Sequence, residues 1–269
     1  MIETPASGSI NRIIIAVDAM YQSINVLELA AKLASHKKIE MSVLFIEDVN
    51  LINYASLPIA REIDLVTAID RQLDDLQLVR VLQTQAQKTS RFLEQLASQF
   101  KINYSFKVLR GHYINEVLSA SLETDVLFLS KQIGMYEKPR LVRSRRVVQS
   151  VTLAPSASTL CVIFDGSPGS GRALILAREL AFATGKELVV LLHISGDESI
   201  GRLRKLVASI TETENGQIHY MVVSDEDNSS LSRILRRNKC ELLVLYKSGR
   251  EQLTGSFLEK PGCPVVVVQ

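Results

Sequence analysis

Short apolar runs alternate along the whole chain with longer segments whose apolar residues recur at helical spacing. The runs at residues 12–17 and 160–164 consist almost entirely of apolar residues, which predicts strands buried on both faces. The segments that follow them, residues 23–35 and 171–184, place apolar residues three and four positions apart, which predicts helices. Strands that alternate with helices in this way form parallel sheets covered by helices.

The same patterns predict the other elements of two similar halves. In the first half we expect strands at 41–46, 103–109 and 126–130 and helices at 76–100 and 114–122. In the second half we expect strands at 187–193, 218–223, 241–246 and 264–268 and helices at 199–211, 229–237 and 255–259. A fifth strand of the first half is not equally clear: either residues 147–153 form a weak one, or that sheet is one strand shorter.

An internal repeat without gaps relates the two halves. Asp18 aligns with Asp165, Leu27 aligns with Leu174, and the match continues beyond the first helix. We therefore predict two tandem doubly wound parallel-sheet domains at 1–157 and 158–269. The first carries an insert at about 50–99, which is too long for a simple connection and must contain structure of its own.

The insert at 50–99 has two interpretations. Its apolar residues, for example in the stretch from Leu57 to Glu62, could cover the first crevice or build the surface of a homodimer. Apolar residues at helical spacing more commonly pack on their own core. We therefore expect this segment to pack on the first domain.

Composition and charge exclude several classes of protein. A chain of 269 residues with 46% hydrophobic residues supports two cores. A net charge of +2 gives no reason to expect a nucleic-acid partner. Apolar runs are too short to span a membrane, and the first residues lack the pattern of a signal peptide. The three cysteines have no paired spacing, and Cys161 and Cys263 are expected to be buried thiols. We expect a cytoplasmic protein without a membrane partner.

The most informative segment is the turn that follows the first strand of the second half. Asp165, Gly166 and Ser167 connect an apolar strand to a helix, and the first backbone N–H groups of a helix bind phosphates well. The segment nearly matches the P-loop of nucleotide hydrolases, but Arg172 replaces its lysine and Ala173 replaces its magnesium-binding hydroxyl. The sequence therefore argues against a P-loop enzyme.

Two further motifs complete a resemblance to a known family. The segment VIFDGSPGSGRALILAREL begins at Val162, and the segment ELLVLYKSG begins at Glu241. A valine-rich segment runs from Cys263 to Val268. Together they resemble the universal stress protein (UspA) family, here as a tandem pair that covers nearly the whole chain. The resemblance implies a Rossmann-like fold of the adenine nucleotide alpha hydrolase type, with a ligand crevice at the carboxyl ends of the strands.

The resemblance also implies where a nucleotide would bind. Members that bind ATP carry Gly-x-x-Gly, nine residues and then Gly-Ser or Gly-Thr after the fourth strand. The second half keeps Gly249 and, after a short gap, Gly255 and Ser256, whereas the first half has no later Gly-Ser and has Ala19 after Asp18. The loop of the second half is shorter than the motif and lacks its second glycine. If ATP binds, we expect it in the second half, with six contact residues: Asp165, Gly166, Ser167, Gly249, Gly255 and Ser256.

Other polar residues have competing interpretations. Asp165 and Asp18 could each accept a hydrogen bond from a ribose or adenine, or each could cap the turn that follows it. For Asp18 the capping role is favoured. The basic run at 138–146 could bind an anion, but a solvated loop is the simpler interpretation. His112 is the histidine best placed for a ligand, and the histidines and cysteines show no metal-binding spacing.

These observations leave hypotheses from three classes. The first is a stress-response protein that acts by binding, with an adenine nucleotide such as ATP in the second domain and neither a metal nor a catalytic residue. The second is an interaction or scaffold protein that binds no nucleotide and whose two halves form a pseudo-dimer that contacts other proteins. The third is a weak nucleotide hydrolase, which the alanine at position 173 argues against.

Overall fold

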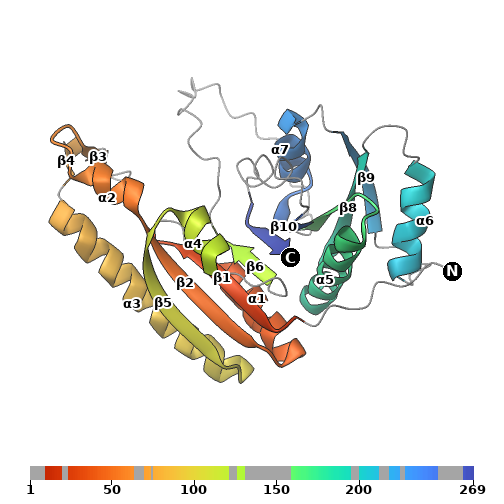
Figure 1. Cartoon of the computed structure of the whole chain (residues 1–269), viewed down its shortest axis with the longest axis horizontal. Helices are drawn as coiled ribbons and strands as arrows, with labels where there is room; N and C mark the ends of the chain where they lie inside the picture. Colours follow the sequence, from red (N-terminus) through yellow and green to blue (C-terminus); the bar gives the residue numbers. More distant parts are fainter. Residues whose placement is uncertain are drawn as a thin grey trace, which may run out of the picture. The chain divides into compact units, whose positions relative to one another are not determined.

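The computed structural model describes residues 10–19, 24–63, 70–73, 75–120, 126–130, 159–194, 200–211, 218–224, 228–247 and 263–269. They form two compact units, which we call the N-terminal unit (10–130) and the C-terminal unit (159–268) (Figure 1). The predicted boundary between residues 157 and 158, the uncertain strand at 147–153 and the helix at 255–259 lie outside the described residues.

The N-terminal unit contains a parallel sheet in the order β5-β2-β1-β6. A separate antiparallel pair, β3 and β4, belongs to the insert. The elements are β1 (Arg12–Asp18), α1 (Ile24–Lys37), β2 (Glu40–Asp48), α2 (Val49–Ala55), β3 (Arg61–Ile63), β4 (Asp70–Gln72), α3 (Asp75–Phe100), β5 (Tyr104–Gly111), α4 (Tyr113–Ala120) and β6 (Val126–Leu129).

The C-terminal unit repeats this order and adds one strand. Its strands run β9-β8-β7-β10-β11 and are all parallel. The elements are β7 (Thr159–Phe164), α5 (Pro168–Thr184), β8 (Glu187–Ile194), α6 (Ile200–Thr211), β9 (Ile218–Ser224), α7 (Asn228–Arg237), β10 (Cys240–Tyr246) and β11 (Val265–Val268). The predicted α/β fold with doubly wound parallel sheets is confirmed.

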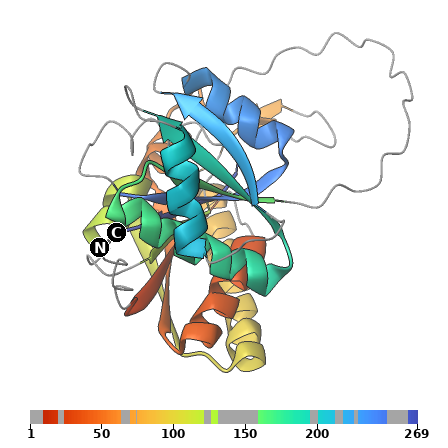
Figure 2. The ribbon, with the colours of Figure 1, turned by 90° about the vertical axis from the view of Figure 1, so that its right-hand side faces the viewer.

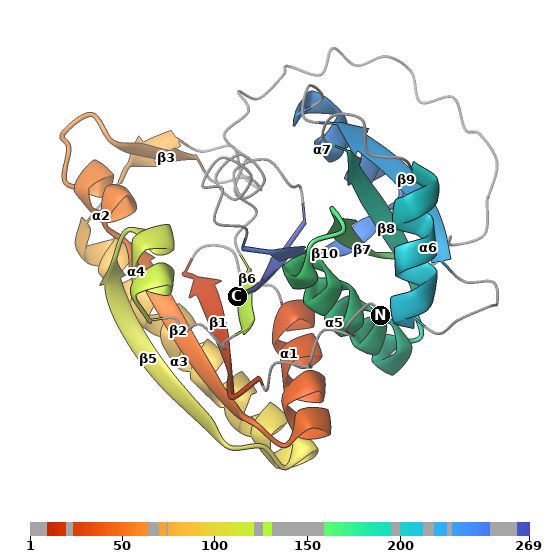
Figure 3. The same ribbon diagram turned by 45° about the vertical axis from the view of Figure 1, so that its right-hand side comes forward.

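Helices cover both faces of each sheet. In the N-terminal unit α1 packs against α3, and α4 lies across the other face of the sheet (Figure 3). In the C-terminal unit α5, in green, and α6, in cyan, pack against each other (Figure 2). Strands between two helical layers have no solvent-facing side, which explains why β1 and β7 are continuous apolar runs and not alternating ones.

The insert packs on its own unit, as predicted, through one stripe of α3. The stripe is buried against α1 and recurs at helical spacing, at Leu78, Leu82, Thr89, Leu93 and Leu96. The apolar stretch before β3 behaves differently, because Leu57 and Ile59 are exposed whereas Ala60 is fully buried. The short elements α2, β3 and β4 were not predicted.

Element boundaries agree with the sequence patterns to within a few residues. The largest shift is at α5, which begins at Pro168 and not at Gly171 as predicted. Ser167 is the N-cap, and Pro168 is accepted at the first helical position because that N–H has no partner within a helix. The helix ends at Gly185, whose φ of 64° is the left-handed conformation that favours glycine.

Candidate functional site

Strand order places the candidate site at the carboxyl end of β7. The chain runs from β7 outward through β8 to β9 and then returns to the opposite side of β7 as β10. Ligands of open α/β sheets bind at such a switch point, outside the carboxyl ends of the two central strands. Asp165 follows β7 directly and Tyr246 is the last residue of β10, so both residues lie at this edge.

The turn after β7 is held by hydrogen bonds between neighbouring residues. The carboxylate of Asp165 accepts from the Ser167 N–H at 2.9 Å. The Ser167 hydroxyl oxygen accepts from the Ser170 N–H at 3.1 Å and so caps α5. Gly166 makes this turn with a φ of 80°, a conformation that other residues rarely adopt. Asp165 therefore caps the turn, which is one of the two roles that the sequence analysis left open.

The buried side chain of Ser170 closes the turn from the helix side. Its hydroxyl donates to the Ser167 carbonyl oxygen at 2.9 Å and accepts from the Asp165 N–H at 3.4 Å. Burial raises the pKa of Asp165, but hydrogen bonds from Ser167 and Ser170 outweigh it and hold that pKa below its ordinary value. The carboxylate is therefore ionised at neutral pH and can only accept hydrogen bonds.

An aromatic ring and a guanidinium group complete the cluster. A Cβ atom built on Gly169 would lie 2.1 Å from the ring of Tyr246, so this ring packs directly against the first turn of α5. The guanidinium carbon of Arg172 lies 5.3 Å from the centre of the same ring. An arginine at this distance is attracted to the face of an aromatic ring. The edge thus combines a carboxylate, an aromatic face and a cation within half-buried side chains.

The corresponding edge of the N-terminal unit is built differently. Asp18 is only 4% exposed, and its N–H donates to the Ser130 hydroxyl oxygen at 3.3 Å, beyond the end of β6. The Ala16 carbonyl oxygen accepts from the Tyr113 hydroxyl at 2.7 Å. The strand end is therefore bonded across the switch point and to α4. Residues 20–23, the turn that Asp18 was predicted to cap, lie outside the described residues.

Comparison with solved structures agrees with this architecture. The crystal structure of a universal stress protein from Archaeoglobus fulgidus DSM 4304 superposes with a TM-score of 0.52 and covers 96% of this chain and 96% of its own, at 13% identity. The chain has the fold of the universal stress proteins. The match spans both units, as the predicted resemblance to this family requires.

Two more structures match with lower TM-scores. A putative universal stress protein from Pseudomonas aeruginosa UCBPP-PA14 covers 97% of this chain and 94% of its own, with a TM-score of 0.46 and 12% identity. A universal stress protein in complex with cAMP covers 42% of this chain and 98% of its own, with a TM-score of 0.35 and 22% identity. No family model and no curated protein matches the sequence.

Of the six predicted contact residues, the structure brings three together. Asp165, Gly166 and Ser167 form one turn, whereas Gly249, Gly255 and Ser256 lie outside the described residues, as does the basic run at 138–146. Sequence analysis did not predict the ring of Tyr246 at this edge. Its position in the sequence was the available signal. In this fold the fourth strand lies next to the first, so the last residue of the fourth strand must lie beside the turn that follows the first strand.

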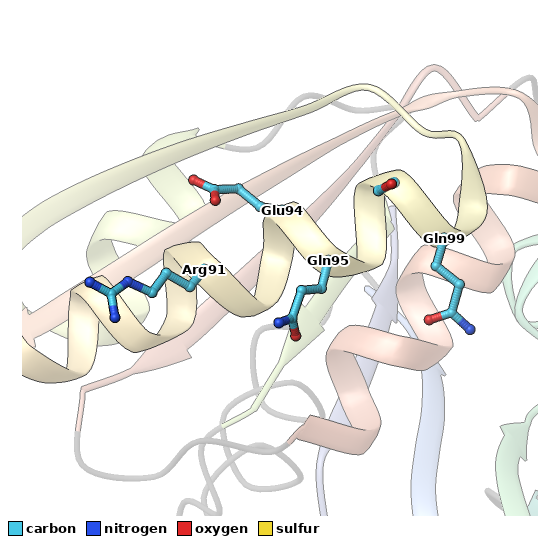
Figure 4. Close-up of a pocket in the computed structure, with 5 residues that line it drawn as sticks. Arg91, Glu94, Gln95 and Gln99 are labelled. Atoms are coloured by element: carbon cyan, nitrogen blue, oxygen red, sulfur yellow. The ribbon is translucent and has the colours of Figure 1, made fainter.

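Other candidate features do not add a second site. His112 is exposed, and its Nδ1 lies 3.4 Å from the Asn50 side-chain nitrogen. A surface hollow of about 720 Å³ lies along α3 (Figure 4) and is lined by Arg91, Glu94, Gln95, Ser98 and Gln99. All five side chains are polar or charged and project from one helix, whereas small-molecule sites are mostly apolar clefts.

Two negative findings apply to the part of the chain that the structure describes. No group of three or more histidine, cysteine, aspartate or glutamate side chains there is arranged to hold a metal ion. None of its helices is long and apolar enough to cross a membrane.

Proposed function

We propose that this chain is a tandem universal stress protein that acts in a stress response by binding, and that the C-terminal unit holds an adenine nucleotide at the carboxyl end of β7. The observation that carries the proposal is the meeting of Asp165, Tyr246 and Arg172 at the switch point of the sheet. A nucleotide has a partner for each of these groups: hydroxyls, a base and phosphates.

Charge decides which part of the nucleotide each group contacts. The ionised carboxylate of Asp165 repels phosphates but accepts hydrogen bonds from a ribose hydroxyl or an adenine amino group. Arg172, the fifth residue of α5, offers a cation near the positive end of the helix dipole, where phosphates are favoured. Tyr246 is half-buried, and the part of its ring that α5 leaves uncovered would contact a base. In this proposal Gly249, Gly255 and Ser256 would complete the phosphate contacts.

The proposal assigns no catalytic step to the site. Ala173 provides no oxygen at the position where a P-loop has its magnesium-binding hydroxyl. A binding role needs only the contacts already named. Release of inorganic phosphate from ATP over time, measured with the purified chain, is expected to stay at the level of the buffer blank, and sustained release would support the hydrolase hypothesis instead.

A second candidate is an interaction protein that binds no small ligand. One observation favours it: two backbone donors at the start of α5 already have partners. The Ser170 N–H donates to the Ser167 hydroxyl, and the Gly171 N–H donates to the Ser167 carbonyl oxygen at 3.0 Å. The ring of Tyr246 also covers Gly169. Phosphate would then have to bind mainly through side chains.

Calorimetric titration of the full chain with ATP, and with cAMP beside it, separates the two candidates. Nucleotide binding predicts a dissociation constant below about 1 mM, or more than about 4 kcal/mol of binding free energy. Arg172→Gln should weaken binding about tenfold or more, since hydrogen bonds to charged groups contribute about 1.5–3 kcal/mol.

The chain offers a matched control for that substitution. Arg204 lies over the ring of Tyr220 at the same 5.3 Å, in α6 and β9 and away from the switch point. Arg204→Gln removes the same kind of contact and should leave affinity unchanged. Absence of binding heat at millimolar nucleotide, or equal losses in both variants, would support the interaction protein.

A further inference from the structure

The three cysteines of the chain gather at the edge of the C-terminal sheet opposite the crevice. Cys240 is the first residue of β10, Cys263 lies just before β11, and Cys161 is near the start of β7. Parallel strands begin at one edge, so neighbouring β7, β10 and β11 bring residues together that are distant in sequence. Spacing along the chain gave no sign of this cluster, because the contacts form only across the sheet.

Two of the thiols are in direct contact. The Cys263 thiol donates to the Cys240 sulfur with the two sulfur atoms 3.7 Å apart. The Cys240 thiol in turn donates to the Leu242 carbonyl oxygen at 3.2 Å. The register of β10 and β11 pairs Leu243 with Val265, which places Cys263 beside the residue that follows Cys240. The strands are fixed in place by the hydrogen bond from the Leu243 N–H to the Pro264 carbonyl oxygen at 3.0 Å.

Burial distinguishes the three thiols. Cys161 is fully buried and Cys263 is only 3% exposed, whereas Cys240 is the most exposed of the three. Hydrogen bonding with Cys161, then with Cys263, together with burial, raises the pKa of Cys240. The thiol is therefore protonated at neutral pH, so that its reaction with an oxidant is slow compared with that of an acidic catalytic cysteine.

We propose that Cys240 and Cys263 form a reversible disulfide bond when the protein is exposed to a peroxide. The Cys240 thiol gives up its proton, and the thiolate attacks one oxygen of hydrogen peroxide. The O–O bond breaks, the hydroxide that leaves takes up the proton, and the products are a sulfenic acid and water. The Cys263 sulfur then attacks the Cys240 sulfur, the S–O bond breaks, and a second water leaves with the remaining proton. The two thiols together lose two electrons and two protons, and the peroxide is reduced to water.

This proposal does not depend on nucleotide binding. It assigns a modification site to the amino-terminal edge of the sheet, whereas the crevice lies at the carboxyl-terminal edge. Cys161 stays outside the bond in this scheme because its sulfur is fully buried and because the sulfur in contact with Cys240 at 3.7 Å is that of Cys263.

The test oxidises the full-length chain with a small excess of hydrogen peroxide at mildly alkaline pH, blocks the remaining thiols with a maleimide, and measures the intact mass. The expected product has lost two hydrogen atoms and carries one maleimide. Digestion without reduction should give a peptide that joins Cys240 to Cys263, and treatment with a dithiol should restore three reactive thiols.

Variants sharpen the test without being essential to it. Cys161→Ser should still form the bond, whereas Cys240→Ser and Cys263→Ser should not. The peptide map of the unchanged chain decides the matter even if a variant folds poorly. Three thiols that stay reactive after peroxide, a bond that includes Cys161, a bond between two chains, or direct oxidation to sulfinic acid would each overturn the proposal.

Discussion

The two units share one strand order but end their first strand in different ways. In the C-terminal unit, Asp165 bonds to its own turn and to the helix that follows, through Ser167 and Ser170. In the N-terminal unit, the Asp18 N–H bonds to Ser130 beyond the end of β6, and the aspartate is almost fully buried. The first arrangement is local, whereas the second crosses the switch point.

This difference follows from the residues after each aspartate. Gly166 with its positive φ and the pair Ser167-Pro168 allow a tight turn that caps α5 at once. Ala19 follows Asp18 instead, and its N–H donates to the Ile46 carbonyl oxygen of β2 at 3.2 Å. The same strand order can therefore end its first strand in a turn that bonds only to itself, or in a strand end that bonds to neighbouring strands. In the first case, side chains such as Tyr246 lie at the switch point.

The largest expected effect comes from filling the contact between α5 and β10. Gly169→Val places branched carbons where the ring of Tyr246 lies, since even a Cβ would be 2.1 Å from it. Overpacking of this kind costs about 1–3 kcal/mol of unfolding free energy. Urea denaturation measures the loss of unfolding free energy. In a chain that also carries Tyr246→Ala, Gly169→Val should cost much less than it does beside the ring. An equal loss with and without the ring would show that this contact is not the cause.

A smaller effect is expected on the other side of the comparison. Ser130→Ala removes an acceptor of the Asp18 N–H in a buried position, and the loss of one hydrogen bond costs about 0.5–1.5 kcal/mol of unfolding free energy. Hydrogen exchange of peptides covering β1 should become faster while peptides covering β7 stay unchanged. Faster exchange in both would mean that the two strand ends are not independent.

The capping serine of the C-terminal unit gives the reciprocal test. Ser167→Ala removes the N-cap of α5 and should lower the unfolding free energy by about 1 kcal/mol. Ser167→Asp keeps an acceptor at the cap and should lose much less. Here the faster exchange is expected at the start of α5 and not in β1, and equal losses in the two variants would exclude the cap as the cause.

The smallest effect concerns pH. The pKa of Asp165 lies below its ordinary value of 3.8, so the carboxylate stabilises the folded state above that pH and the stabilisation is lost as the pH falls through the lowered pKa. Asp165→Asn keeps an acceptor but cannot ionise. The urea midpoints of the two proteins should differ at pH 6, and the difference should shrink as the pH falls below 3.8. A constant difference would mean that the charge of Asp165 does not stabilise the turn.

The apolar patterns of the sequence predicted the buried strands and the helices that occur in both units. The runs around Ile14 and Val162 are strands because both faces of each sheet are covered, and a continuous apolar run records this directly. The turn at Asp165 was predicted because glycine, serine and proline each mark a specific backbone conformation. Short elements such as α2 were missed because seven residues do not establish a helical period, and the cap of α2 by Asp48 was the available signal.

What the sequence could not provide is contact between residues distant along the chain. Gly169 and Arg172 of α5 meet the ring of Tyr246 at the end of β10. The sulfur contact of Cys240 joins the start of β10 to the residues before β11. Periodicity fixes which face of an element is buried but not which neighbour it meets. The candidate site therefore extends beyond the glycine and serine residues that the motif predicted.

Hydrogen exchange of the full chain with and without saturating ATP tests the central claim, that the C-terminal unit alone presents a ligand crevice at its switch point. The account predicts slower exchange in peptides that cover residues 165–172 and 243–247, and no change in peptides that cover residues 13–19. Slower exchange at residues 13–19, or no change in either unit at millimolar ATP, would contradict it.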